Sequence, residues 1–174
     1  MRSIDVSIVV LAALLVSASV PAGAAQEVAG CDKFAWPLTK ERAWFAAADK
    51  VTVAAGGTLA VVPRGAFVVR LQPGGRASFA LPPERQPKSS GWFGGAVSLP
   101  AVARSGIYQV TLSDEAWIDV VQDGRYARSV GSSGRHDCPG MRKSVRLELE
   151  ATRFVLQLSG AASDAITVAV SPSE

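Results

Sequence analysis

The most reactive side chains of this sequence gather in a glycine-rich stretch, residues 131–140, which holds the single histidine, His136. A hydrolase would place His136 beside a carboxylate, such as Asp137 or Asp119, and beside a serine nucleophile. The Gly-x-Ser-x-Gly turn that presents this serine in many hydrolases does not occur in the sequence. The stretch therefore favours an exposed loop, and an unrecognised hydrolase stays open as the alternative.

The acidic residues do not form a metal-binding pattern. Asp114, Glu115 and Asp119 come closest to a cluster, but they lack the ligand spacing of a calcium-binding loop. Asp114 and Glu115 are typical of a turn between two strands. The sequence also contains no phosphate loop and no dinucleotide fingerprint. We therefore expect neither a metal nor a cofactor.

Basic side chains are concentrated in the second half of the chain: Arg125, Arg128, Arg135, Arg142, Lys143 and Arg146. If the strands that carry them are neighbours, their outward positions form a basic face that attracts anionic envelope polymers such as peptidoglycan, lipopolysaccharide or acidic polysaccharide. The alternative is a solvated sheet face or a protected sheet edge. The net charge of +3 is small and spread along the chain, which argues against a nucleic-acid partner.

Aromatic side chains offer a second kind of binding surface. Trp92, beside Phe93 and two glycines, would stack on a sugar ring if exposed, or close the end of the fold if buried. Trp117 is expected in the interior together with Ile118, Val120 and Val121. The candidate binding residues are therefore Trp92, Tyr126, Arg128, His136, Arg142 and Arg146.

The chain has two cysteines, Cys31 and Cys138. An even number in an exported protein predicts a disulfide, which would close a loop of more than 100 residues. Residues 28–31, with the sequence VAGC, also resemble a lipobox, in which Cys31 would become the acylated first residue of a lipoprotein. That alternative would leave Cys138 as a free thiol.

Residues 1–25 have the three parts of a secretion signal: a positive start at Arg2, an apolar run, and small residues before the cut. The apolar run covers residues 6–20, which is shorter than the roughly 20 residues of a membrane-spanning helix. We therefore expect cleavage after Ala24 or Ala25, with a transmembrane anchor as the alternative. The mature chain, residues 26–174, would then be periplasmic or secreted and would contain no transmembrane segment.

One helix is expected near the start of the mature chain. Thr39 is a good N-cap, and residues 40–50 are rich in alanine and other helix formers. Three side chains of this segment, together with the preceding leucine, would face the main body: Leu38, Trp44, Phe45 and Ala48.

From residue 51 onward, short runs of alternating apolar and polar residues indicate strands. The turn signal Asp123-Gly124 predicts a tight hairpin, and residues 82–91, with three prolines, predict an extended surface connection. The sequence therefore predicts a single all-β domain over residues 26–174, an antiparallel sandwich or jelly roll. Its expected strands are 51–54, 58–62, 66–72, 76–81, 92–99, 107–113, 116–122, 125–130, 143–149, 152–159 and 165–171.

Two families share motifs with this sequence. The strand IYQVTLS, the hairpin WIDVVQDG and the closing pair RFVLQLSG and ITVAV lie within residues 107–170. This part resembles the end of a prepeptidase C-terminal type domain, a secreted bacterial β-sandwich. The resemblance implies the fold, and it brings no catalytic residues.

The whole mature chain resembles a family of uncharacterised exported proteobacterial proteins through CDKFAWPLTKERAWF, FALPPERQPKSSGWFGGAVSLP, GIYQVTLSDEAWIDVVQDG and HDCPGMRKSVRLEL. Some members are labelled homogentisate 1,2-dioxygenase, which implies an oxygenase. Such an enzyme binds ferrous iron through two histidines and a carboxylate, and this chain has one histidine. We therefore expect an exported, non-enzymatic β-sandwich protein that binds an envelope component or a partner protein. An oxygenase or a hydrolase is the alternative.

Overall fold

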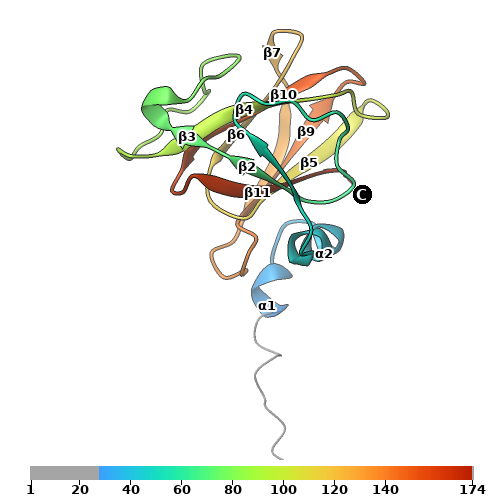
Figure 1. The fold of residues 1–174 in the computed structure, drawn as a ribbon. Coiled ribbons are helices and arrows are strands. Elements are labelled where there is room, and N and C mark those ends of the chain that lie inside the picture. Colours follow the sequence, from blue (N-terminus) through green and yellow to red (C-terminus); the bar gives the residue numbers. More distant parts are fainter. Residues whose placement is uncertain (1–27, 174) are drawn as a thin grey trace, which may run out of the picture.

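The computed structural model describes residues 28–173 and consists of two β-sheets packed face to face, with two short helices on the outer side of the larger sheet (Figure 1). Neighbouring strands are antiparallel, except for the first two of the larger sheet. The larger sheet has six strands, in the order β1 (Val51–Ala54), β2 (Phe67–Arg70), β11 (Ala165–Pro172), β5 (Gly106–Leu112), β9 (Lys143–Leu149) and β8 (Ser129–Gly134). The smaller sheet has five, in the order β3 (Gln72–Pro73), β4 (Phe93–Leu99), β10 (Phe154–Ala161), β6 (Trp117–Gln122) and β7 (Arg125–Tyr126). The predicted all-β sandwich is confirmed.

The core between the sheets is built by the apolar positions of the alternating strands. Val110 and Leu112 of β5 are completely buried, and Leu156 and Leu158 of β10 are 1% exposed. They meet in one continuous cluster to which all the long strands except β8 contribute. Since side chains on a strand alternate between its two faces, the same alternation sends the polar residues outward.

These outward polar residues are buried as well. Gln109 and Thr111 of β5 are 4% and 0% exposed, and Gln157 of β10 is 1% exposed. The reason is that a segment of chain lies across the outer face of each sheet and forms hydrogen bonds with Gln109, with Gln157 and with Ser144, the neighbour of Thr111.

The outer face of the six-stranded sheet is covered by an N-terminal segment that contains α1 (Val28–Cys31) and α2 (Thr39–Ala46). The Trp36 indole N–H donates to Ser144 Oγ at 3.1 Å, and Ser144 Oγ also accepts from Thr111 Oγ1 at 3.0 Å. Glu41, 2% exposed, accepts hydrogen bonds from Gln109 Nε2 at 2.8 Å and from Ser171 Oγ. Polar contacts therefore fix this segment on the sheet.

The predicted helix is present, but its limits and its buried face differ from the prediction. Leu38 occupies the N-cap position without a side-chain cap, Thr39 is already helical, and the chain becomes extended at Ala47. Ala48, expected to face the body, is exposed, whereas Glu41 is buried. The prediction is confirmed for Leu38, which is buried, and for Phe45, which packs against the same apolar cluster. It was wrong for Ala48, because the polar outer face of the sheet also takes up the carboxylate of Glu41 through hydrogen bonds.

The outer face of the five-stranded sheet is covered by residues 80–88, which we name the strap. Gln157 Oε1 accepts from the backbone N–H groups of Ala80 and Leu81, and Gln157 Nε2 donates to the Leu81 carbonyl at 3.1 Å. The Tyr126 hydroxyl donates to the Pro82 carbonyl, and Asp119 Oδ2 accepts from Glu84 N–H at 3.2 Å. The proline-rich connection therefore lies on the sheet, where the expected strand over residues 76–81 is replaced by a 3₁₀ turn (Gly74–Arg76) and the start of the strap.

Three other expected strands also need correction. Residues 58–62 form only an isolated bridge between Thr58 and Ser98. Residues 66–72 divide into β2 and β3, and residues 125–130 divide into β7 and β8, with each pair split between the two sheets. The tight turn at Asp123 and Gly124 is confirmed: both residues have positive φ, 49° and 72°, and Gln122 pairs with Arg125.

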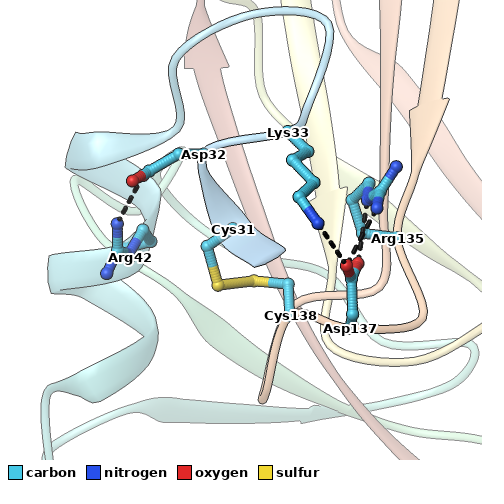
Figure 2. The surroundings of a disulfide bond; sticks show 7 residues. All are labelled: Cys31, Asp32, Lys33, Arg42, Arg135, Asp137 and Cys138. Atoms are coloured by element: carbon cyan, nitrogen blue, oxygen red, sulfur yellow. Dashed lines mark hydrogen bonds and ion pairs between the residues drawn. A yellow bond between two sulfur atoms is a disulfide. The ribbon is translucent and has the colours of Figure 1, made fainter. Parts of the chain in front are cut away.

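The disulfide between Cys31 and Cys138 is present and links positions 107 residues apart (Figure 2). It lies in a second, smaller apolar cluster with Phe34, Leu38 and Met141. The bond therefore ties the N-terminal segment to the glycine-rich loop. A Cys31 sulfur bonded to Cys138 has no valence left for a lipid chain, so the disulfide and the lipoprotein alternative exclude each other.

The predicted signal at residues 1–25 lies outside the described residues. Within residues 28–173, no helix combines the length and the apolar composition needed to cross a membrane.

Candidate functional site

The structure does not bring a catalytic triad together around His136. The ring nitrogen Nε2 of His136 lies 2.7 Å from Arg142 Nη2. Asp137 pairs instead with Arg135 and Lys33, at 2.9 and 3.3 Å (Figure 2). The other candidate carboxylate, Asp119, is under the strap. Among residues 28–173, no carboxylate pairs with the imidazole. A hydrolase of the expected type would need a carboxylate there to orient the ring.

The expected loop over residues 131–140 begins only after Gly134, because Ser132 and Ser133 lie on β8 and pair with β9. Ser133 Oγ accepts a hydrogen bond from Ala35 N–H at 3.0 Å, so it helps to hold the N-terminal segment. The Arg135 guanidinium and the Lys33 ammonium beside Asp137 hold the pKa of that carboxyl far below its usual range. This part of the loop is therefore an ion-paired attachment point beside the disulfide.

The predicted basic face is interrupted by carboxylates. β8 and β9 are neighbours, as the prediction required, whereas β7 belongs to the other sheet. Arg128 forms a two-pronged ion pair with Glu148, and Arg142 pairs with Glu115 at 3.0 Å. Arg146 lies over the Trp36 ring, 4.4 Å from its centroid. The charges of Arg128 and Arg142 are therefore locally compensated by carboxylates.

The two predicted aromatic candidates have structural contacts. Trp92 is half-buried and stacks against Phe79 at a centroid distance of 6.3 Å. It also lies so close to Gly74 and Gly94 that a Cβ atom on either would come within 2.4 and 2.7 Å of the indole. Tyr126 is held to the strap, and burial together with the charges of Asp119 and Glu84 raises the pKa of its phenol. Both rings are packed against protein.

A different group of residues, which the sequence did not single out, surrounds Trp117 at the end of the strap. We define the Trp117 recess as the cavity of about 260 Å³ lined by Arg85, Lys88, Glu115, Trp117, Lys143 and Ser159, with their neighbours in sequence. The Arg85 guanidinium lies 5.4 Å from the Trp117 ring centroid, and the Lys143 ammonium lies 5.1 Å from it. Both distances are in the range of a cation–π contact.

The alternation of β6 explains why Trp117 lies here. Ile118 and Val120 point into the core, so Trp117 and Asp119 point to the outer face. The Trp117 indole N–H donates to Asp119 Oδ1 at 2.7 Å, and burial raises the pKa of Asp119. Trp117 was therefore wrongly expected in the interior. The sequence held one signal for the outer position. Asp119 is polar and lies two positions after Trp117, so the two side chains share a face of the strand.

Ser159 forms the inner wall of the recess. It is paired with Trp117 across β10 and β6, so the two side chains are neighbours on one face. Ser159 is 2% exposed, and its Oγ has no hydrogen-bond partner among the described residues. A β-bulge lies at this point, because the register with β4 shifts between Leu158 and Ala161. Buried hydroxyls are nearly always hydrogen-bonded, so this unpartnered group is a candidate hydrogen-bond donor to a ligand.

The recess has an excess of positive charge. Arg85 and Lys88 form no ion pair with any described carboxylate. Lys143, whose side chain is 14% exposed, lies 3.5 Å from Glu115 and donates to the Ala116 carbonyl at 2.9 Å. Glu115 is the one acidic residue of the lining, and it is shared with Arg142 outside the recess. The recess is therefore suited to a negatively charged group.

A second cavity, the apolar groove, lies beside α2 and has a volume of about 740 Å³. Its lining includes Trp44, Val61, Pro63, Pro100 and Tyr108. Val61 is 68% exposed, which leaves part of this surface open to solvent. Unlike the recess, it contains no buried polar group without a partner among the described residues. The described residues also hold no group of three His, Cys, Asp or Glu side chains able to share a metal ion.

Comparisons of the chain with protein-family models, with curated proteins and with solved structures gave no match. The two resemblances that the sequence motifs suggest therefore stay predictions. The candidate site rests on the contacts of the described residues alone.

Proposed function

We propose that this protein is an exported, non-catalytic binding protein that binds a negatively charged component of the cell envelope. The observation that carries the proposal is the Trp117 recess, where cations without full neutralisation surround a half-buried tryptophan and an unpartnered buried hydroxyl. Such a concave site with a few convergent polar groups is typical of ligand binding.

The absence of an assembled catalytic group supports the non-catalytic part of the proposal. Among the described residues, His136 contacts an arginine, and the carboxylates expected beside it have other partners. Export is supported by the secretion-signal pattern of residues 1–25 and by the disulfide, because disulfides persist mainly in oxidising compartments.

The location of the site differs from the one that the sequence suggested. Arg128 and Arg142 are each ion-paired with a carboxylate, whereas Arg85 and Lys88 have no acidic partner among residues 28–173. Charge that is not locally compensated attracts an anionic ligand more strongly. We therefore assign binding to the recess and not to the face formed by β8 and β9.

Co-sedimentation of the purified protein with peptidoglycan sacculi and with lipopolysaccharide tests the proposal. We expect binding to at least one of them, weakened by raising the salt from 50 to about 500 mM because charge attraction is screened. The double variant Arg85→Gln/Lys88→Gln should lose most of the binding. The charge-matched control Arg104→Gln/Arg125→Gln changes residues outside the recess and should bind like the wild type. Binding to neither polymer, or equal loss in both variants, would overturn the proposal.

A further inference from the structure

We propose that the Trp117 recess recognises a phosphate monoester carried by a sugar. This inference rests on the proposed function and specifies its ligand. It follows from three features of the recess: its charge, its hydrogen-bond donors and its size.

The charge of the recess fits a dianion. The lining contains three cations, Arg85, Lys88 and Lys143, and one carboxylate, Glu115. Since Glu115 also pairs with Arg142, it neutralises no more than one of the three. A phosphate monoester carries a charge between about −1.5 and −2 at pH 7, whereas a sugar carboxylate carries −1. The phosphate therefore balances the recess more completely.

The donors also fit a group with several acceptor oxygens. A guanidinium presents a fork of N–H groups that matches two phosphate oxygens, and an ammonium supplies further donors. Ser159 lines the recess, and its hydroxyl, which is buried and lacks a partner among the described residues, would supply one more. A three-oxygen group would thus satisfy the one buried polar side-chain atom that the described fold leaves unsatisfied.

The arrangement of the cations points in the same direction. The Arg85 guanidinium is held near the Trp117 ring, at 5.4 Å, and not by an acidic side chain of the described residues. A cation–π contact positions a cation without cancelling its charge. At about 260 Å³ the recess is slightly below the usual range of about 300–1,000 Å³ for ligand pockets. It therefore suits a phosphate with one attached sugar ring, whether that sugar is free or belongs to a polymer.

Isothermal titration calorimetry with glucose 1-phosphate, glucuronate and glucose, each at pH 7.5 and 50 mM salt, tests the inference. We expect glucose 1-phosphate to bind and glucose not to bind. The affinity for glucuronate should be lower than that for glucose 1-phosphate by about tenfold or more. Ser159→Ala should weaken glucose 1-phosphate binding by about tenfold, the loss of one hydrogen bond to a charged group, without lowering the unfolding temperature. The control Arg104→Gln/Arg125→Gln should leave the affinity unchanged.

The outcomes separate this inference from the proposed function. If the protein binds sacculi or lipopolysaccharide but not glucose 1-phosphate, the ligand inference is wrong and the function stands. Equal affinity for glucuronate, or an unchanged affinity of Ser159→Ala, would also overturn the inference. Phosphatase treatment of lipopolysaccharide distinguishes the source: loss of binding indicates a polymer-bound phosphate. Binding of glucose 1-phosphate without binding to either polymer supports the ligand and contradicts the envelope function.

Discussion

Two buried serines on the outer faces of the two sheets form a matched pair for mutation. Ser144 on β9 is completely buried, and Ser159 on β10 is 2% exposed. Ser144 Oγ accepts from the Trp36 indole and from Thr111, whereas Ser159 Oγ has no partner among the described residues. The same change to alanine should therefore have opposite effects on stability.

The expected magnitudes come from the hydrogen bonds that each change removes. Ser144→Ala breaks two hydrogen bonds and leaves the fully buried Thr111 hydroxyl without this acceptor. We expect a loss of about 2 kcal/mol, since each hydrogen bond contributes about 1 kcal/mol and an abandoned buried group costs about 1–3 kcal/mol. Ser159→Ala breaks none and removes a buried polar group, so it should stabilise the ligand-free protein by about 1 kcal/mol.

Chemical and thermal unfolding of the purified ligand-free variants measure both effects. For a domain of this size, we expect the unfolding midpoint to fall by about 4–8 °C in Ser144→Ala and to rise by about 2–4 °C in Ser159→Ala. A loss in Ser159→Ala as large as that in Ser144→Ala would refute the reasoning. It would mean that Ser159 has a structural partner in the folded protein and that its hydroxyl is not available to a ligand.

Replacing Cys31 and Cys138 together by alanine should destabilise the protein by about 2–5 kcal/mol, because the bond closes a long loop in the unfolded chain; a midpoint equal to that of the wild type in urea unfolding would contradict this. Asp119→Asn and Asp137→Asn should change the pH dependence of stability in opposite directions. Burial raises the pKa of Asp119 above 3.8, so wild type should gain stability relative to Asp119→Asn as the pH falls through that raised pKa. Arg135 lowers the pKa of Asp137, so wild type should lose stability relative to Asp137→Asn as the pH falls below 3.8. Unfolding curves between pH 7 and pH 3 measure both effects, and parallel trends in the two variants would disprove the assignment. The intact mass of the exported protein should correspond to a chain that begins after Ala24 or Ala25 and has lost two hydrogens to the disulfide; several hundred additional daltons would instead indicate acylation at Cys31.

The sandwich could be predicted because local patterns agree with the final fold. The alternation in β5 and β10 separates the core residues Val110 and Leu156 from their polar neighbours. A shift of one residue in the strand register would move every core side chain to the outer face, so the register is well determined. The Asp123-Gly124 turn is similarly local, since both residues tolerate positive φ. The partner of Cys31 was predictable by elimination, because Cys138 is the one other cysteine.

The covers on the two outer faces could not be predicted from local patterns. Nothing in the alternation of β5 or β10 shows that Gln109 and Gln157 are buried, because burial depends on segments far away in the sequence. The hydrogen bonds of Gln157 reach Ala80 and Leu81, and those of Gln109 reach Glu41. The same long-range contacts shorten the helix and replace the expected strand over residues 76–81.

The candidate site was missed for a related reason. Arg85 and Lys88 belong to the strap, whereas Lys143 and Ser159 come from two different strands. Only the folded chain brings them together around Trp117. The sequence drew attention to the denser arginines near His136, and their acidic partners, such as Glu115 and Glu148, became visible only in three dimensions.

The four tryptophans allow one measurement to test the central claim, because each marks a different surface. Trp117 lies in the recess, Trp44 in the apolar groove, Trp36 beneath Arg146, and Trp92 beside Phe79. The indole N–H signals of ¹⁵N-labelled protein can be assigned by single Trp→Phe variants and followed during addition of glucose 1-phosphate. Our account predicts that the Trp117 signal shifts in a saturable manner while the other three stay in place. A saturable shift confined to Trp44, Trp36 or Trp92, or no shift at all, would contradict it.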